Sequence, residues 1–169
     1  KAMGQMLRAH SQELFTGARG VGSDQVPTVE DVEEQFQRIL RMSTERRRTP
    51  QIVRELGALA RMVQLLSDPS ATLGMTPLRE RFEAYGNEHL NRLVVTKEPY
   101  WAIDAPYDPR PRLLELYRLK YERHHALAPH FDPEKAQPVG SWDVLSVPFA
   151  QLQLAFSTGV NATANFWIL

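Results

Sequence analysis

The chain has 169 residues, of which 43% are hydrophobic and 24% charged, as in one soluble globular domain with a sizeable core. Its 20 basic and 20 acidic residues cancel, so no net field attracts nucleic acid or an anionic membrane. The absence of cysteine excludes disulfides, thiolate zinc sites and a cysteine nucleophile. We therefore expect one domain over residues 1–169 and no nucleic-acid partner.

The two ends of the sequence indicate a fragment or a processed form of a longer chain. The sequence opens on Lys1 without an initiator Met, and it stops at Leu169 within an apolar pattern. No signal peptide is recognisable, and the residues themselves leave export open. The predominance of Arg, 16 against 4 Lys, favours a GC-rich bacterial source.

Helical periodicity dominates the first half of the sequence. Thr28 is the expected N-cap of a first helix, and the glycine-containing stretch 17–27 before it predicts a loop. Thr49-Pro50 starts a second helix, which ends near Asp68-Pro69 because proline disfavours the α conformation in the residue before it. The apolar face of the first helix repeats every three or four residues: Val29, Val32, Phe36, Ile39 and Leu40.

The same start signal recurs at Thr76-Pro77, and Asp108-Pro109 predicts a further helix start. Residues 94–111 between these two helices form an aromatic, proline-rich connection. The pattern predicts an all-α, compact bundle of about five to seven helices. The expected faces of the two helices are Leu78, Phe82, Tyr85, His89 and Leu93, and Leu113, Leu116, Tyr117, Tyr121 and His124.

Residues 141–169 carry no charge after Asp143 and keep helical spacing. A central helix buried on most sides is the favoured interpretation. The glutamines, asparagines and Pro148 argue against a transmembrane span, so we do not expect an integral membrane protein. A helix that binds a partner or rests on a membrane is the other alternative. The glycosylation sequon at Asn161 is interpreted as a coincidence.

Few residues could carry chemistry. His124 and His125 are adjacent on a helix and point about 100° apart, so they cannot easily share one metal ion. Pro129 is expected to break the helix before His130. We interpret this cluster as helix-end capping and packing, with metal binding as the alternative. His10 and His89 are isolated, as expected of hydrogen-bonded core histidines.

Arg61 lies in the otherwise apolar stretch 56–66. A buried guanidinium must be paired with an acidic group, because an unpaired internal charge is costly. The alternative is that Arg61 extends out of a half-buried helix. The basic run 46–48 is interpreted as a solvated helix end rather than a phosphate-binding patch.

The segments 55–69 and 79–85 resemble the zinc-dependent phospholipase C superfamily, which includes the single-strand-specific nucleases. Intact members carry a His and an Asp one turn apart on one helix, a further His after a turn, and a His one turn before the Glu of Phe-Glu-x-Tyr. Residues four apart share a helix face, so two such helices can surround a zinc cluster. Hydroxide bridging the metals then attacks a phosphoester.

The five corresponding positions here are Arg61, Leu65, Ala71, Arg79 and Glu83, and only Glu83 keeps a ligand. Arginine stays protonated and offers no lone pair, and Leu and Ala offer no ligand at all. The resemblance therefore implies a phospholipase C/nuclease-like fold without catalytic residues, a metal or a cofactor. In place of the lost cation, we expect Arg61 to pair with Glu83, and Arg79 to share that carboxylate.

The resemblance implies a non-catalytic relative, exported as such families often are, that binds a lipid or protein partner. A first alternative is an active metal-dependent phosphoesterase or phospholipase with a relocated zinc site. That site would use His124, His125 and His130 with Asp104 or Asp108. A second alternative sets the family aside and assigns a helical interaction domain that docks through its uncharged C-terminal helix.

Overall fold

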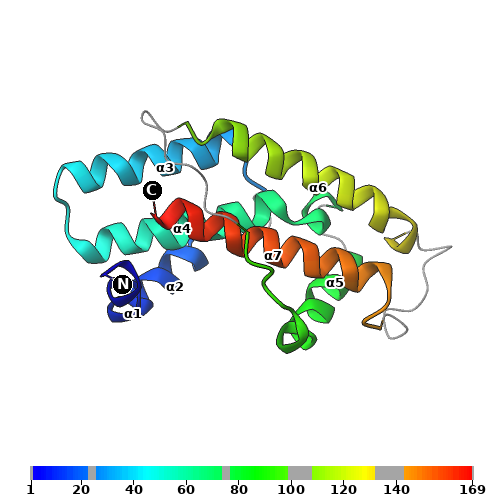
Figure 1. Cartoon of the computed structure of the whole chain (residues 1–169). Helices are drawn as coiled ribbons and strands as arrows, with labels where there is room; N and C mark the ends of the chain where they lie inside the picture. Colours follow the sequence, from blue (N-terminus) through cyan, green and yellow to red (C-terminus); the bar gives the residue numbers. More distant parts are fainter. Residues whose placement is uncertain (1, 23–25, 74–76, 99–107, 132–142, 169) are drawn as a thin grey trace.

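The structure is a computed structural model and describes residues 2–22, 26–73, 77–98, 108–131 and 143–168. This part of the chain is an all-helical bundle, which confirms the predicted fold class (Figure 1). Its elements are α1 (Ala2–Ala9), α2 (Ser11–Arg19), α3 (Val29–Thr44), α4 (Thr49–Ser67), η1 (Pro69–Leu73), α5 (Pro77–Glu88), η2 (Leu90–Arg92), α6 (Arg110–Phe131) and α7 (Val147–Ile168), where η marks 3₁₀ helices.

Helix α4 is the centre of the bundle. It packs against α2, α3, α6 and α7, so its apolar residues contact partners on several sides (Figure 1). The rings of Phe36 and Phe166 meet edge to face, with centroids 5.3 Å apart, and join α3 to α7. A second, smaller core lies under α5. Its buried residues are Phe82, Tyr85, Leu127 and Phe149.

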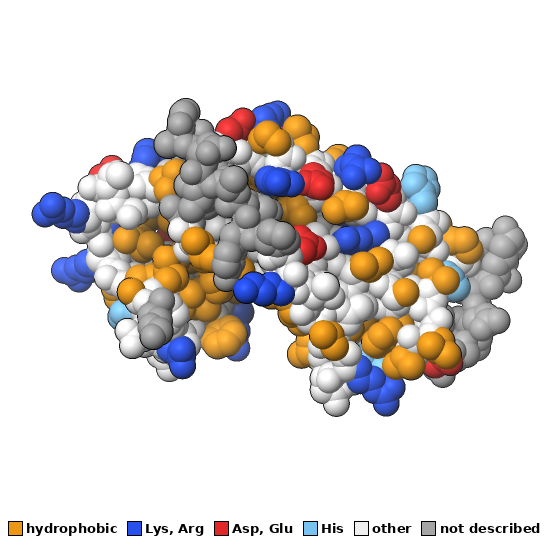
Figure 2. Space-filling model, viewed as in Figure 1, with side chains coloured by type: hydrophobic (Ala, Val, Ile, Leu, Met, Phe, Trp, Pro, Cys, Tyr) orange, Lys and Arg blue, Asp and Glu red, His pale blue; other side chains and the backbone are white. Residues whose placement is uncertain are grey.

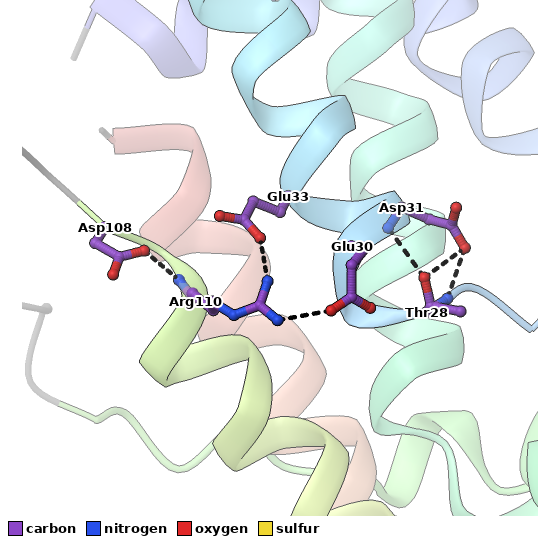
Figure 3. Close-up of polar contacts among 6 residues, drawn as sticks. All are labelled: Thr28, Glu30, Asp31, Glu33, Asp108 and Arg110. Atoms are coloured by element: carbon purple, nitrogen blue, oxygen red, sulfur yellow. Dashed lines mark hydrogen bonds and ion pairs between the residues drawn. The ribbon is translucent and has the colours of Figure 1, made fainter.

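The predicted start of α3 is confirmed. The Thr28 hydroxyl accepts a hydrogen bond from the Asp31 N–H at 3.1 Å, and the Asp31 carboxylate accepts one from the Thr28 N–H at 2.8 Å (Figure 3). This reciprocal arrangement satisfies two N–H groups at the helix end. Helix α4 differs slightly from expectation, because Thr49 is already helical and Arg48 is the N-cap residue.

Arg110 joins the start of α6 to the start of α3. Its guanidinium donates to Glu30 at 2.7 Å and to Glu33 at 2.8 Å, and its backbone N–H donates to the Asp108 carboxylate at 2.9 Å (Figure 3). Asp108 thus caps the helix that its Asp-Pro pair predicts. Exposed ion pairs contribute only about 0–1 kcal/mol each, so this cluster mainly sets the register of the two helices.

The expected loop at residues 17–27 is wrong at its start, because α2 extends through Gly17 to Arg19. Gly17 and Gly57 lie where α2 crosses α4. A Cβ built on Gly17 would lie 1.8 Å from the Arg54 carbonyl oxygen, and one on Gly57 would lie 1.9 Å from that of Leu14. Glycine serves here for close backbone approach within helices, and not for a turn.

Two expectations for α6 are also wrong. The helix continues through Pro129 to Phe131, since a proline in the last turn removes only one backbone hydrogen bond. Tyr117 and Tyr121 do not face inward. They are exposed, and Lys120 is buried between them, with its Nζ 4.7 Å from the Tyr117 ring centroid. Tyrosine tolerates this position because its ring is apolar and its hydroxyl is polar.

Helix α7 packs on α4 and α6, but it is not the central helix, buried on most sides, that its uncharged sequence favours. It leaves Val147, Leu154, Val160 and Ile168 exposed. Its polar residues satisfy the backbone of residues 94–98, which run along it in an extended conformation (Figure 1). Gln153 bonds both backbone groups of Val94. None of the helices in the described part is both long and apolar enough to cross a membrane.

Two further residues of α7 bond to the backbone of residues 94–98. The Ser157 hydroxyl accepts from the Thr96 N–H at 3.0 Å, and the Asn161 amide donates to the Thr96 carbonyl at 2.8 Å. The spacing of four residues places Gln153, Ser157 and Asn161 on one face of α7. We call residues 94–98 the strap. By fixing the strap, these side chains also fix η2, which precedes it.

Replacing Gly17 or Gly57 with alanine is expected to lower the free energy of unfolding by about 2 kcal/mol or more, because the new Cβ meets rigid backbone. Gly4→Ala in α1 is the matched control, since nothing lies within 4 Å of its Cβ. That change should be neutral or stabilise by up to about 1 kcal/mol. Urea unfolding measures all three variants. Equal stabilities would contradict the close crossing.

Candidate functional site

A groove of about 660 Å³ lies between α4, α5, η2 and α7. In the space-filling view the lower outline of the molecule is indented between the end that carries α1 and α2 and the lobe that carries α5 (Figure 2). The groove is mostly apolar on the α7 and η2 side. The main apolar side chains are Leu90, Leu93, Leu152, Phe156, Val160 and Trp167.

The opposite wall of the groove is polar. Arg61 and Gln64 of α4 and Glu83 and Asn87 of α5 line it. The Arg61 guanidinium donates to the Gln64 side-chain oxygen at 2.9 Å. The site therefore combines one apolar and one polar side, which suits a ligand with both characters.

The five positions identified by the resemblance divide into two groups. Arg61 and Glu83 line the groove. Leu65, Ala71 and Arg79 are buried, with exposed fractions of 1%, 4% and 1%. The five positions therefore do not share one open site.

The expected Arg61–Glu83 pair is wrong, because Arg61 bonds Gln64 on its own helix. The second part of that expectation is confirmed: Arg79 donates from Nε to Glu83 at 3.0 Å. The buried cation of this region is thus Arg79. It comes from the same helix as its partner, four residues earlier, a spacing that favours such pairs.

Asp68 is the residue that the sequence analysis missed, since its Asp-Pro context indicated only a helix end. Its carboxylate accepts from the Ser70 N–H at 2.8 Å and from the Ser70 hydroxyl at 2.7 Å. Burial raises the pKa of Asp68, although the Ser70 bonds and the charge of Arg79 oppose that shift. Burial lowers the pKa of Lys120, and the nearby Asp68 charge partly offsets this. Asp68 lines the groove, and with the buried Arg79 and Lys120 behind it forms a charged cluster.

The histidines lie apart from the groove lining. His124 uses Nδ1 in hydrogen bonds with the Thr72 hydroxyl and, at 3.3 Å, the Pro69 carbonyl, which joins α6 to η1. The ring centroids of His124 and His125 are 6.3 Å apart. Among the described residues, His, Asp and Glu side chains nowhere gather in threes in a way that could hold a metal ion. Asp104 lies outside the described residues.

The two isolated histidines differ in their surroundings. His89 is half-buried and packs on Tyr85 with ring centroids 4.3 Å apart, and its Nδ1 lies 3.0 Å from the Tyr85 carbonyl oxygen. It is the hydrogen-bonded histidine that the sequence predicts. His10 lies between α1 and α2, with Nδ1 4.0 Å from the Glu13 carboxylate. It is less enclosed than expected.

The chain matches no protein family model, no curated protein and no solved structure. The likeness to zinc-dependent phospholipases C is therefore a resemblance of sequence motifs alone, in residues 55–69 and 79–85.

Arg79→Met is expected to lower the free energy of unfolding by roughly 2–4 kcal/mol, because it removes the buried partner of Glu83 and one of the two cations near Asp68. Arg61→Met is the matched control on the groove wall. It should stay within about 0.5 kcal/mol of the native protein, since its only described partner is a neutral amide. Chemical denaturation compares the two. Similar costs would show that the Arg79 guanidinium is not required.

The raised pKa of Asp68 predicts a pH dependence of stability. The folded chain holds the Asp68 proton more tightly than the unfolded chain does. Its contribution is therefore most favourable below the ordinary pKa of 3.8 and is lost as the pH rises toward the raised value. Asp68→Asn keeps the shape and removes the titration. Relative to this variant, the native protein should lose stability as the pH rises from 3.8. A pH-independent difference in unfolding free energy would contradict the shift.

Proposed function

We propose that this protein is a non-catalytic relative of the zinc-dependent phospholipases C and binds a small amphipathic molecule in the groove between α4, α5 and α7. The groove carries the proposal. Its volume of about 660 Å³ lies within the usual range for small-molecule sites, roughly 300–1,000 Å³. Its apolar and polar walls face the same space, which favours an occupant with an apolar chain and a polar head.

The side chains at the former ligand positions support binding without turnover. Arginine, leucine and alanine supply no metal ligand at four of the five positions. The one remaining carboxylate, Glu83, already accepts a charge-assisted hydrogen bond from Arg79. A zinc ion at Glu83 would have to displace this bond and would face the guanidinium at close range.

The two alternative functions find less support. A relocated zinc site at His124 would have to break its hydrogen bonds with Thr72 and Pro69. Docking through α7 would have to use its exposed apolar positions, Val147, Leu154, Val160 and Ile168, because its other faces contact α4, α6 and the strap. Ligand binding in the groove leaves the His124 hydrogen bonds and the packing of α7 in place.

Ala155→Trp is expected to abolish binding of a single-chain amphiphile, because Ala155 lines the groove and the indole would fill it. Ala150→Trp is the matched control, since Ala150 is exposed on the same helix and away from the lining. Isothermal titration with 1-dodecanoylglycerol, below its micelle concentration, measures the affinity. Binding that survives Ala155→Trp would place the ligand elsewhere.

The same preparation tests the absence of turnover. Incubation with a chromogenic phosphodiester and added zinc should release no product above the background rate. Zinc should also leave the thermal midpoint unchanged, since a ligand that binds only the folded state raises it. Zinc-dependent turnover would contradict a non-catalytic role.

A further inference from the structure

The charges around the groove are not evenly matched. Glu83 is paired with Arg79. Asp68 is bonded to Ser70 and lies near the charges of Arg79 and Lys120. These two carboxylates therefore have their countercharges in the wall behind the groove.

Arg61 is the basic residue that lines the groove. In the part of the chain that the structure describes, it makes one hydrogen bond, to the neutral amide of Gln64, and no ion pair. Its guanidinium lines the groove and is only partly exposed. A half-buried cation with a neutral partner favours an anion in the adjacent space.

The position of Arg61 along the groove follows from the way α7 lies on α4. The Trp167 indole N–H lies 3.4 Å from the Leu56 carbonyl oxygen, and a Cβ on Gly159 would lie 3.2 Å from the Ser67 hydroxyl. The two helices are therefore antiparallel, and Arg61 lies beside α7 at a level between these two contacts. Beyond Gly159, the apolar wall continues through Phe156 to Leu152, which approaches Gly86 of α5.

We propose that the occupant is a single-chain anionic amphiphile, a fatty-acid carboxylate, with its head on Arg61 and its chain along α7 toward Leu152. Residues 152–163 of α7 span about 16 Å, which accommodates a medium-length alkyl chain. A planar guanidinium matches a carboxylate through two parallel hydrogen bonds. This inference rests on the proposed function and names the ligand class of the same groove.

The charge balance favours a carboxylate over a phosphate monoester head. One unpaired cation neutralises one negative charge. The second charge of a phosphate monoester would lie near Glu83 and Asp68 without a partner of its own, and an uncompensated charge in an enclosed site is costly. The groove volume also suits a small molecule better than an amphipathic helix.

Titration of the full chain with three ligands of equal chain length tests the proposal: dodecanoate, uncharged 1-dodecanoylglycerol and cationic dodecyltrimethylammonium. Dodecanoate should bind roughly tenfold more tightly than the uncharged ligand, from one charge-assisted contact, and the cation should bind most weakly. Arg61→Met should reduce dodecanoate binding to the level that the same variant shows for the uncharged ligand. Arg61→Lys should keep most of the preference. Arg41→Met, on the exposed surface of α3, controls for the lost charge and should have no effect.

The possible failures are distinguishable. Equal binding of the three ligands, or a preference that Arg61→Met does not change, overturns the carboxylate assignment and leaves the amphiphile groove in place. Absence of binding for all three overturns the groove function as well. A fourth titration uses dodecylphosphate. If it binds more tightly than dodecanoate and Arg61→Met removes this preference, the choice of a carboxylate head is overturned.

Discussion

Residues 94–98 form an extended strap whose backbone groups bond to side chains of α7 rather than to another strand. The strap lies at the surface, and Gln153, Ser157 and Asn161 supply hydrogen-bond partners for its backbone in a row along the helix. This row explains why an otherwise apolar helix contains regularly spaced amides and hydroxyls. It also holds η2 beside α7, so that Leu90 and Leu93 form one wall of the groove.

The charged cluster of Asp68, Arg79 and Lys120 has a different role. A buried arginine contributes little net stability, because desolvation offsets most of its attraction to carboxylates. Arg79 does, however, fix Glu83 on its own helix and lies near Asp68 at the end of α4. Together with the hydrogen bonds of His124 to η1, these contacts tie α4, η1, α5 and α6 together.

The sequence predicted the elements with strong local signals and missed those that depend on packing. The Thr28 cap and the proline starts identified α3, α4 and α6. The glycine at position 17 indicated a loop, whereas it lies inside α2, because close helix crossing and turns both require glycine and only tertiary structure distinguishes them. Likewise, the apolar stretch around Arg61 indicated either a buried, paired cation or one that extends from a half-buried helix, whereas the fully buried arginine is Arg79. Helical periodicity identifies a face but not its neighbours, and the partner of Glu83 depends on how α4 and α5 meet.

The groove is more than a gap left by imperfect packing. Helix α5 packs Phe82 and Tyr85 into the second core and contacts η1 and η2 at its ends. These short elements are themselves held by His124 and by the strap. Moving α5 toward α7 to close the groove would break one of these end contacts. A space that the surrounding elements hold open exposes apolar side chains such as Leu90 and Val160 to water, which is unfavourable unless a ligand covers them. The same constraints that prevent collapse thus preform the site, and an amphiphile that fills it would regain the free energy of apolar burial without reordering the chain.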